Sequence, residues 1–496
     1  MFQPKLASLV DDWLPSASID TLQEAMEKGE ISSKDLVLMY LHRISQYDKK
    51  GPKINSVLEV NPDAVFIAEA LDLERKRSGK RGPLHGIPIL LKDNIDTGDM
   101  MHTSAGSLAL ENHVAKEDST VASQLREAGA VILGKTNMTE WANFMTENMP
   151  NGFSSRGGQV LNPYGPGTFD VGGSSSGSGA AIASGLAAAA IGTETSGSIL
   201  SPASSNSIVG IKPTVGLISR KGIIPISFSQ DTAGPMTKTV QDAAILLSAL
   251  TKQDKKDIAT YINPEPGIDY TAFLLKDGLK GKRIGVAKDP SFTYLSDEEA
   301  LMMEEAIASL RDNGAIVIDS VEIPFAKEKW DYNTLLYEFK PSLNAYLHQT
   351  GPTVPIKNLK ELIAFNKRDF EVMLQHKQTV LEESESLSGK LVEEEYIQSR
   401  EKDIYRTREA GIDALMAEYN LDAILTPNNY GAGIPAKAGY PSITVPAGYT
   451  NEGKPVGATF TARAFEESTL IQIAYGYEQA TNHRKAPILK EKEVKA

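Results

Sequence analysis

The sequence contains no cysteine among its 496 residues. This absence excludes disulfide bonds, thiol nucleophiles and cysteine-ligated metal sites. The string His-Glu-x-x-His, which marks one class of zinc hydrolases, is missing as well. We therefore expect a protein that binds no metal and needs no cofactor. A chain without cysteine is also compatible with the cytoplasm, where we expect this protein to be located.

Long apolar runs and an excess of basic charge are also missing. No window of eighteen apolar residues occurs, and Met1–Lys5 carries no hydrophobic signal core, so we expect a soluble, untargeted protein without a membrane partner. The 51 lysines and arginines are outnumbered by 64 acids, which gives a net charge of −13. Because nucleic-acid phosphates are bound by clustered cations, this balance disfavours a nucleic-acid partner.

Histidine is sparse, and none lies within ten residues of the two serine-rich segments described next. The seven are His42, His85, His102, His113, His348, His376 and His483. Histidine is the usual base that accepts the proton of a serine nucleophile. The spacing weakens a serine–histidine mechanism without excluding it, since a distant histidine could fold into place.

Glycine and serine are concentrated in Gly172–Gly179, which is followed at once by an Ala-rich helical run and then by a second hydroxyl cluster, Thr193–Ser198. A Gly/Ser linker would not continue into helix formers. Upstream, an apolar strand that begins at Gly86 ends in Lys92. A lysine replaces histidine as a base only when it is neutral, and burial at the end of an apolar strand favours the neutral form.

Lysine, loop serine and turn serine in this order resemble the amidase signature family. Thr193–Ile199 and the later stretch Gly222–Met236 are most similar to its bacterial peptide amidase branch. The resemblance implies an α/β amidase signature fold, in which helices cover both faces of a large mixed β-sheet. It also implies a serine amidohydrolase that cleaves carboxamides through an acyl-enzyme. For this branch we expect release of ammonia from the C-terminal amides of peptides.

The resemblance assigns roles to residues. Lys92 is the base, Ser174 is the bridging serine within a cis peptide, and Ser198 is the nucleophile. The oxyanion donors implied with the N–H of Ser198 are those of Thr195, Ser196 and Gly197, and Ser175 orients the pair of serines. Asn143 and Phe144 are expected to help form the substrate pocket. Asp231 is expected to be structural.

The chain departs from the commoner family pattern Gly-Gly-Ser-Ile-Arg with a preceding Asp. It has Glu194, Ser196 and Leu200 at the three differing positions. Loss of the arginine removes an ion pair that would brace the turn, so the support of this turn must differ here.

Other interpretations remain open. Within the family they are a general aliphatic or aryl amidase and the A subunit of a glutamyl-tRNA amidotransferase, which the missing Gly-Gly-Ser-Ile-Arg disfavours. A silent binding protein on the same scaffold is an alternative of another class. Gly173–Gly177 also matches the nucleophile elbow Gly-x-Ser-x-Gly around Ser175, but an elbow explains neither Lys92 nor the second cluster. Gly129–Thr136 matches a phosphate-binding loop only by accident, because its middle is an apolar strand.

The chain as a whole is expected to form one amidase domain, 1–496, acting as a monomer or homodimer on a small-molecule or peptide amide. Its parts are a helical segment 1–80, a catalytic core 86–250 and a charged helical region 330–420 that shapes the substrate pocket. Thr21–Glu24 has the pattern of a capping box, with Gly29 as the stop of that helix. Strand-like runs are Ala130–Leu133, Arg283–Val286, Ala315–Ile318, Asp422–Leu425, Ser442–Val445 and Gly457–Thr461.

Overall fold

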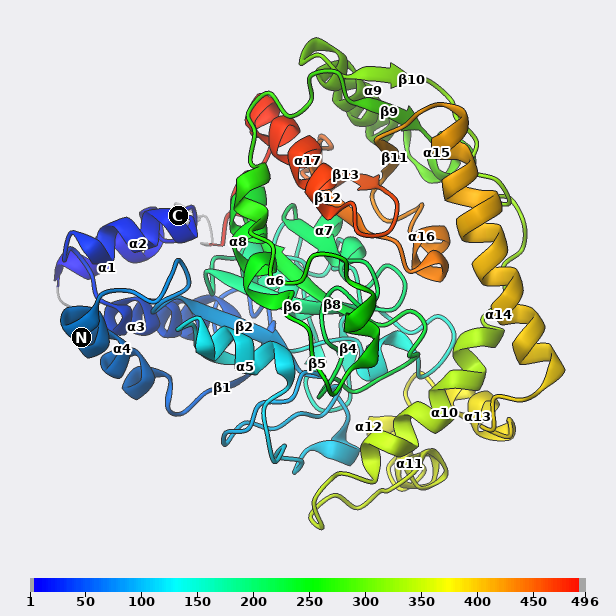
Figure 1. Cartoon of the computed structure of the whole chain (residues 1–496). Helices are drawn as coiled ribbons and strands as arrows, with labels where there is room; N and C mark the ends of the chain where they lie inside the picture. The colour runs from blue at the N-terminus through cyan, green and yellow to red at the C-terminus, as the bar shows by residue number, and fades with distance from the viewer. Residues whose placement is uncertain (1–3, 490–496) are drawn as a thin grey trace, which may run out of the picture.

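A single sheet of 11 strands forms the centre of the molecule in a computed structural model that describes residues 4–489 (Figure 1). Its strand order is β1-β3-β2-β6-β8-β7-β12-β13-β11-β9-β10. The strands are β1 (Val57–Val60), β2 (Pro88–Lys92), β3 (Val131–Thr136), β6 (Ala189–Glu194), β7 (Val209–Lys212), β8 (Thr232–Thr237), β9 (Arg283–Val286), β10 (Ile316–Ile318), β11 (Ala423–Pro427), β12 (Ser442–Tyr449) and β13 (Pro455–Thr461). A separate two-stranded ribbon pairs β4 (Phe153–Ser154) with β5 (Gly158–Gln159).

The sheet is mixed. The neighbours β3, β2 and β6 are parallel, and so are β11, β9 and β10. Between these groups the order from β6 to β11 is antiparallel throughout. All six strand-like runs predicted from the sequence overlap observed strands, and β2 ends at Lys92 with every residue buried.

Helices form the N-terminal part of the chain and cover the two faces of the sheet. They are α1 (Pro4–Asp12), α2 (Ile19–Glu27), α3 (Ser33–Arg43), α4 (Ala64–Ser78), α5 (Thr120–Glu127), α6 (Ser176–Ala183), α7 (Leu200–Ser205), α8 (Val240–Leu250), α9 (Asp297–Asp312), α16 (Gly433–Ala438) and α17 (Glu467–Thr481). Helices α6 and α7 pack together against the sheet, and α8 packs with α17 against the sheet. The expected mixed sheet with helices on both faces is confirmed.

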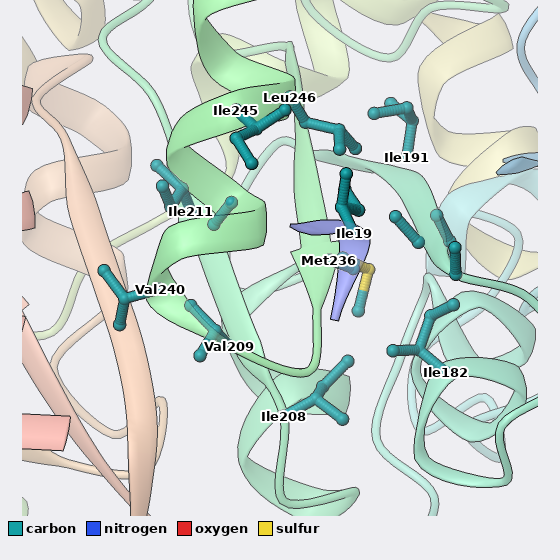
Figure 2. Packing of buried hydrophobic residues seen from close by; sticks show 14 of the residues in the cluster. Ile19, Ile182, Ile191, Ile208, Val209, Ile211, Met236, Val240, Ile245 and Leu246 are labelled. Atoms are coloured by element: carbon teal, nitrogen blue, oxygen red, sulfur yellow. The ribbon is translucent and has the colours of Figure 1, made fainter. Parts of the chain in front are cut away.

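The packing of α8 illustrates why this sheet is buried. Its apolar residues lie over strands β6, β7 and β8, which carry aliphatic side chains on the facing side (Figure 2). Labelled there are Ile19, Ile182, Ile191, Ile208, Val209, Ile211, Met236, Val240, Ile245 and Leu246. A strand that is covered on both faces needs a nearly continuous apolar sequence, which explains why a lone Lys92 in β2 stands out.

A helical region lies between β10 and β11, as the charged stretch 330–420 predicts. It contains α10 (Asn333–Leu347), α11 (Leu359–Asn366), α12 (Phe370–Met373), α13 (Thr379–Ser386), α14 (Glu394–Thr407) and α15 (Ala414–Glu418). In Figure 1 these helices flank one side of the sheet. Their apolar residues form a cluster with the loop after β3, so the region is anchored next to the catalytic core.

The N-terminal helices correct one detail of the sequence analysis. Helix α2 begins at Ile19, and its cap is Ser18, whose Oγ accepts the N–H of Thr21 at 3.2 Å. The predicted capping box at Thr21–Glu24 is therefore wrong by one helical turn, because Ser18 offers the same chemistry earlier. Gly29 follows the helix end with φ 68°, as a stop residue should. Met1, Phe2 and Gln3, which belong to the predicted absence of a signal core, lie outside the described residues.

Candidate active site

The sheet brings Lys92 next to the second hydroxyl cluster. Lys92 is the last residue of β2, and Thr193 lies near the end of β6. These strands are parallel neighbours, with Leu91 opposite Ile191. The carboxyl ends of parallel strands meet at one edge of a sheet, so residues 101 positions apart in sequence become adjacent.

The first serine cluster reaches the same edge from the loop ahead of α6. The peptide bond between Gly173 and Ser174 is cis, as the family resemblance implies. Lys92 Nζ lies 2.8 Å from Ser174 Oγ, and both side chains are fully buried. The two residues that the sequence placed in one mechanism are therefore in direct contact.

Lys92 has two further oxygen neighbours, both on Thr193. Its Nζ lies 2.9 Å from Thr193 Oγ1 and 3.2 Å from the Thr193 carbonyl oxygen. All three contacts of Nζ are thus to uncharged oxygens. Burial lowers the pKa of Lys92 to about 7, against the opposing effect of the negative charges of Glu194 and Asp231. A large share of Lys92 is therefore neutral near neutral pH.

The second serine turn is held by a carboxylate. Glu194 Oε1 accepts the N–H of Gly197 at 2.7 Å, and Oε2 accepts those of Ile199 at 2.7 Å and Leu200 at 3.0 Å. Burial raises the pKa of Glu194, while Lys212 and the three N–H groups act in the opposite direction. These bonds are the support that replaces the missing family arginine.

Ser198 lies inside this turn. It is 6% exposed, and its carbonyl oxygen accepts the N–H of Ser175 at 3.1 Å. The Ser175 hydroxyl donates to the carbonyl of Thr193 at 3.0 Å and accepts the N–H of Thr193 at 3.2 Å. Ser175 therefore connects the two serine segments through its backbone and fixes Thr193 through its hydroxyl.

The expected oxyanion donors differ in their surroundings. The N–H of Gly197 is engaged by Glu194, so it is not free to bind a substrate oxygen in this structure. Within residues 4–489, the N–H groups of Ser196 and Ser198 donate to no protein acceptor. Ser196 is exposed, whereas Thr195 is buried.

Asp231 supports the other side of the turn. Its carboxylate accepts the hydroxyl of Thr195 at 2.6 Å and the N–H groups of Ile226 and Ser227 at 2.8 and 2.9 Å. Burial raises the pKa of Asp231 to about 6. These contacts agree with the structural role expected for Asp231.

Two cavities lie on either side of the turn. The larger, about 910 Å³, is bordered by Thr193 and Thr195 and by Tyr346 of α10, so the helical region does contribute a wall. The smaller, about 190 Å³, is bordered by Ser196 and by aromatic side chains that include Trp330 and Tyr430. Both cavities therefore lie against the turn that contains Ser198.

The segment after β3 contains Asn143 and Phe144, the two residues expected to help form the substrate pocket. Asn143 is exposed with φ 69°, and Phe144 is buried with its ring 5.0 Å from that of Phe339 on α10. From this segment, Ala142 borders the larger cavity. A substrate contact of Asn143 or Phe144 stays a prediction, and the contact of Phe144 seen here is core packing.

Histidines are engaged elsewhere. His85 Nε2 lies 2.9 Å from the carbonyl oxygen of Leu71, His102 Nδ1 lies 2.9 Å from Glu59, and His113 Nε2 lies 3.0 Å from the hydroxyl of Tyr346. In the part of the chain that the structure describes, no cluster of three or more His, Cys, Asp or Glu side chains could hold a metal ion. Over the same residues, no helix is both long and apolar enough to cross a membrane.

Two residues that lie beside Lys92, namely Thr193 and Asn94, were not singled out by the sequence analysis. Thr193 contacts Lys92 through two oxygens, and Asn94 Nδ2 lies 3.0 Å from Thr193 Oγ1. Both residues are buried. The only signal for them was their place within the two segments that carry Lys92 and Ser198.

Known proteins match nearly the whole chain. The model of the Amidase family matches residues 35–433. A probable amidase of Arabidopsis thaliana is 42% identical over 486 residues, which cover 96% of this chain and 92% of that protein. The native peptide amidase of Stenotrophomonas maltophilia is 44% identical with a TM-score of 0.90, covering 96% and 99% of the two chains. An amidase family protein from Bacillus anthracis strain Ames is 41% identical with a TM-score of 0.93, covering 98% and 95%.

The matches agree with the geometry at the carboxyl ends of β2 and β6, where a buried lysine and two serine segments meet. The chain therefore belongs to the amidase family, with the amidase signature fold, and is a hydrolase that acts on amides.

Proposed function

We propose that the protein hydrolyses carboxamides through an acyl-enzyme formed on Ser198, with Ser174 and Lys92 as a proton relay. The observation that carries this proposal is the 2.8 Å contact between Lys92 Nζ and Ser174 Oγ in a buried site. A lysine with a pKa of about 7 is able to accept a proton at neutral pH.

In the proposed reaction, neutral Lys92 takes the proton of Ser174 as Ser174 takes that of Ser198. Ser198 Oγ then bonds to the amide carbon, and the carbonyl π electrons move onto its oxygen. When the carbon–nitrogen bond breaks, Ser174 gives its proton to the leaving nitrogen and takes one back from Lys92, so that ammonia departs and Lys92 is neutral again. Water repeats the path in the second half, which releases the acid and restores Ser198.

Negative charge on the substrate oxygen needs preorganised donors. The N–H groups of Ser196 and Ser198 lack protein acceptors in the described chain, which makes them our candidates. The hydrogen bonds of the turn to Glu194 would hold the N–H groups of Ser196 and Ser198 in place during the reaction. The N–H of Thr195 remains a further candidate, and that of Gly197 would first have to leave Glu194.

We propose C-terminal amides of peptides as the substrate class, with free ammonia as the leaving group. The support is the 44% identity to a peptide amidase and the cavity of about 910 Å³ beside the turn, which has room for several residues. A general aliphatic or aryl amidase is the alternative that shares this chemistry. The chain is proposed to act without partner subunits, as a monomer or homodimer in the cytoplasm.

A fluorophosphonate tests the nucleophile. One label should add to the protein, and peptide mapping should place it on the fragment that carries Ser198. Ser198→Ala should prevent labelling, whereas Ser175→Ala should retain the label on Ser198. Label on Ser175 in the unmodified protein would contradict the proposal and favour a nucleophile elbow.

A substrate panel tests the class. A peptide that ends in a carboxamide should yield ammonia and the free acid by mass spectrometry, with internal peptide bonds intact. Equal turnover of simple aliphatic amides would favour the general amidase. Turnover of glutamine only with added partner subunits would favour an amidotransferase A subunit, and binding of amides without any product would favour a silent binding protein.

A further inference from the structure

We propose that Thr193 and Asn94 are positioning residues that aim the lone pair of neutral Lys92 at Ser174. The inference rests on the proposed function, since it assumes that Lys92 acts as a base. It explains why Lys92 would take the proton of Ser174 and not that of Thr193.

The hydrogen-bond inventory around Lys92 carries the argument. A neutral amine has two N–H donors and one lone pair, and three oxygens surround Nζ: Ser174 Oγ, Thr193 Oγ1 and the Thr193 carbonyl oxygen, at 2.8, 2.9 and 3.2 Å. The carbonyl oxygen can only accept, so it takes one N–H. The lone pair must then face one of the two hydroxyls.

The two hydroxyls compete for that lone pair. If the Thr193 hydroxyl donated to Nζ, the second N–H of Lys92 would point at Ser174, and the base would be turned away from the proton it must take. If Thr193 accepts, the lone pair points at Ser174. The outcome depends on where the proton of the Thr193 hydroxyl goes.

Asn94 supplies the missing acceptor. Its side-chain amide lies 3.0 Å from Thr193 Oγ1 through Nδ2, while Asn94 Oδ1 is buried and has no hydrogen-bond partner among the described residues. Among residues 4–489, Thr193 Oγ1 has hydrogen-bond contacts with Lys92 Nζ and Asn94 Nδ2 alone, so in that orientation its proton can go only to the lone pair of Lys92. The oxygen and nitrogen of an amide occupy nearly equivalent positions, so the exchanged orientation is sterically equivalent. It lets Asn94 Oδ1 accept the proton of Thr193, and Thr193 then accepts from Lys92.

The backbone of Thr193 is fixed by hydrogen bonds to the side chain of Ser175. Its carbonyl also accepts the Ser175 hydroxyl at 3.0 Å, and its N–H donates to the same Ser175 oxygen at 3.2 Å. The charged groups that face Lys92 are Glu194 at the end of β6 and Asp231 ahead of β8. Both act through charge, which favours protonation of Lys92 without selecting a direction for its lone pair.

The test compares Thr193→Val, which keeps the shape but loses the hydroxyl, with Thr193→Ser, which keeps the hydroxyl. We expect kcat of Thr193→Val toward a peptide carboxamide to fall about tenfold with KM unchanged. Because the ammonium form loses an acceptor, the midpoint of its kcat–pH profile should move to lower pH. Thr193→Ser should restore both kcat and midpoint to near their original values.

Several outcomes would overturn the inference. Full kcat in Thr193→Val, or an equal loss in Thr193→Ser, would show that the hydroxyl does not aim the base. A lower kcat with an unmoved pH midpoint and a lower melting temperature would indicate a structural role alone. Fluorophosphonate labelling of Ser198 in the unmodified protein separates this failure from a failure of the proposed function.

Neutron diffraction of the unmodified protein gives an answer that does not depend on the variants folding. Deuterium on Thr193 Oγ1 should point toward Asn94 Oδ1. An N–D bond of the Asn94 amide directed at Thr193 Oγ1 would overturn the inference.

Discussion

Two buried lysines, Lys92 in the catalytic core and Lys437 on α16 beside the helical region, have different hydrogen-bond partners. Lys437 on α16 lies with its Nζ 2.9 and 3.0 Å from the two carboxylate oxygens of Asp403 on α14. Lys92 on β2 is surrounded by hydroxyl and carbonyl oxygens. The buried cation of α16 is paired with an anion of the helical region, whereas among residues 4–489 Lys92 of the catalytic core has no carboxylate within hydrogen-bond distance.

The difference explains which lysine can work as a base. A carboxylate within hydrogen-bond distance of a lysine stabilises the ammonium form, whereas burial without such a carboxylate favours the neutral amine. In the described part of the chain Lys92 has no such partner, and burial lowers its pKa to about 7. The same feature that would let Lys92 act as the proposed base makes it costly to bury, whereas Lys437 links two helices.

The largest effect is expected at Lys92. Lys92→Arg keeps the charge but cannot release a proton at any working pH, and Lys92→Met removes the base. Loss of a general base costs about 10²- to 10⁴-fold in kcat, and both variants should show it while remaining folded. Steady-state kinetics with a peptide carboxamide measures the loss. Substantial activity in Lys92→Arg would mean that Lys92 acts as a fixed cation, and the relay would have to be abandoned.

The next effect is expected at the paired lysine. Lys437→Met leaves Asp403 buried without its cation, which should lower the free energy of unfolding by about 3–5 kcal/mol. The double variant Lys437→Met/Asp403→Asn should recover much of this loss, because the neutral amide can still accept the hydroxyl of Thr334. Urea denaturation measures both. An unchanged denaturation midpoint in Lys437→Met would break the comparison between the two lysines.

A third effect concerns a buried carboxylate of the catalytic core. Glu194→Gln replaces an acceptor of three N–H groups by an amide that has a single acceptor oxygen. An unpaired buried donor costs about 1–3 kcal/mol, so we expect kcat/KM to fall about 10- to 100-fold as the turn relaxes.

Glu467→Gln is the matched control for Glu194→Gln. Glu467 is also fully buried, and it accepts the N–H of Thr214 at 2.6 Å, outside the serine turn. Its kcat/KM should stay near the original value. Equal losses in the two variants would show that the turn is not specifically held by Glu194.

The contrast between the two regions also explains what the sequence could predict. Lys92, Ser174 and Ser198 lie in short segments whose composition is unusual on its own, and the resemblance of these segments to the amidase signature family supplied the roles proposed for the three residues. The strand that ends in Lys92 was equally clear, because a covered strand must be apolar throughout.

The rest depended on tertiary structure. The wall of the larger cavity joins Asp96 to Tyr346 by a hydrogen bond of 2.7 Å between residues 250 positions apart, which no local pattern encodes. The positive φ angles of Trp141, Ala142 and Asn143 could not be predicted, because no glycine marks this turn in the sequence. From the sequence we predicted only that the turn lacks the ion pair of the commoner family pattern. The hydrogen bonds of Glu194 could not be predicted, because their donors are backbone N–H groups.

The fourth effect is the pH dependence of turnover. The base must be neutral, so kcat should rise with pH about tenfold per unit well below pH 7 and reach a plateau above it. At pH 6 we expect roughly a tenth of the plateau rate. Rate profiles from pH 5 to 9 measure this. A midpoint near 10, the value of an exposed lysine, would show that burial does not tune Lys92.

The smallest effect is expected in the stability of Lys92→Met. In the folded protein the pKa of Lys92 is about 7, whereas an unfolded lysine has about 10.4. Below pH 7 both states are protonated, and the full cost of burying the charge is present. Between about pH 7 and 10 the unfolded state binds more protons at this residue, so its contribution to stability rises with pH by up to about 1.4 kcal/mol per unit.

Lys92→Met removes this contribution together with the hydrogen bonds of Nζ, and the two losses oppose each other. We therefore expect a variant that at pH 6 is as stable as the unmodified protein or slightly more so, and whose advantage shrinks as the pH rises toward 9. Urea midpoints of both proteins at pH 6, 7.5 and 9 measure the trend. A stability difference that is constant over this range would mean that Lys92 has the same proton affinity in the folded and unfolded chains, and the contrast with Lys437 would lose its physical basis.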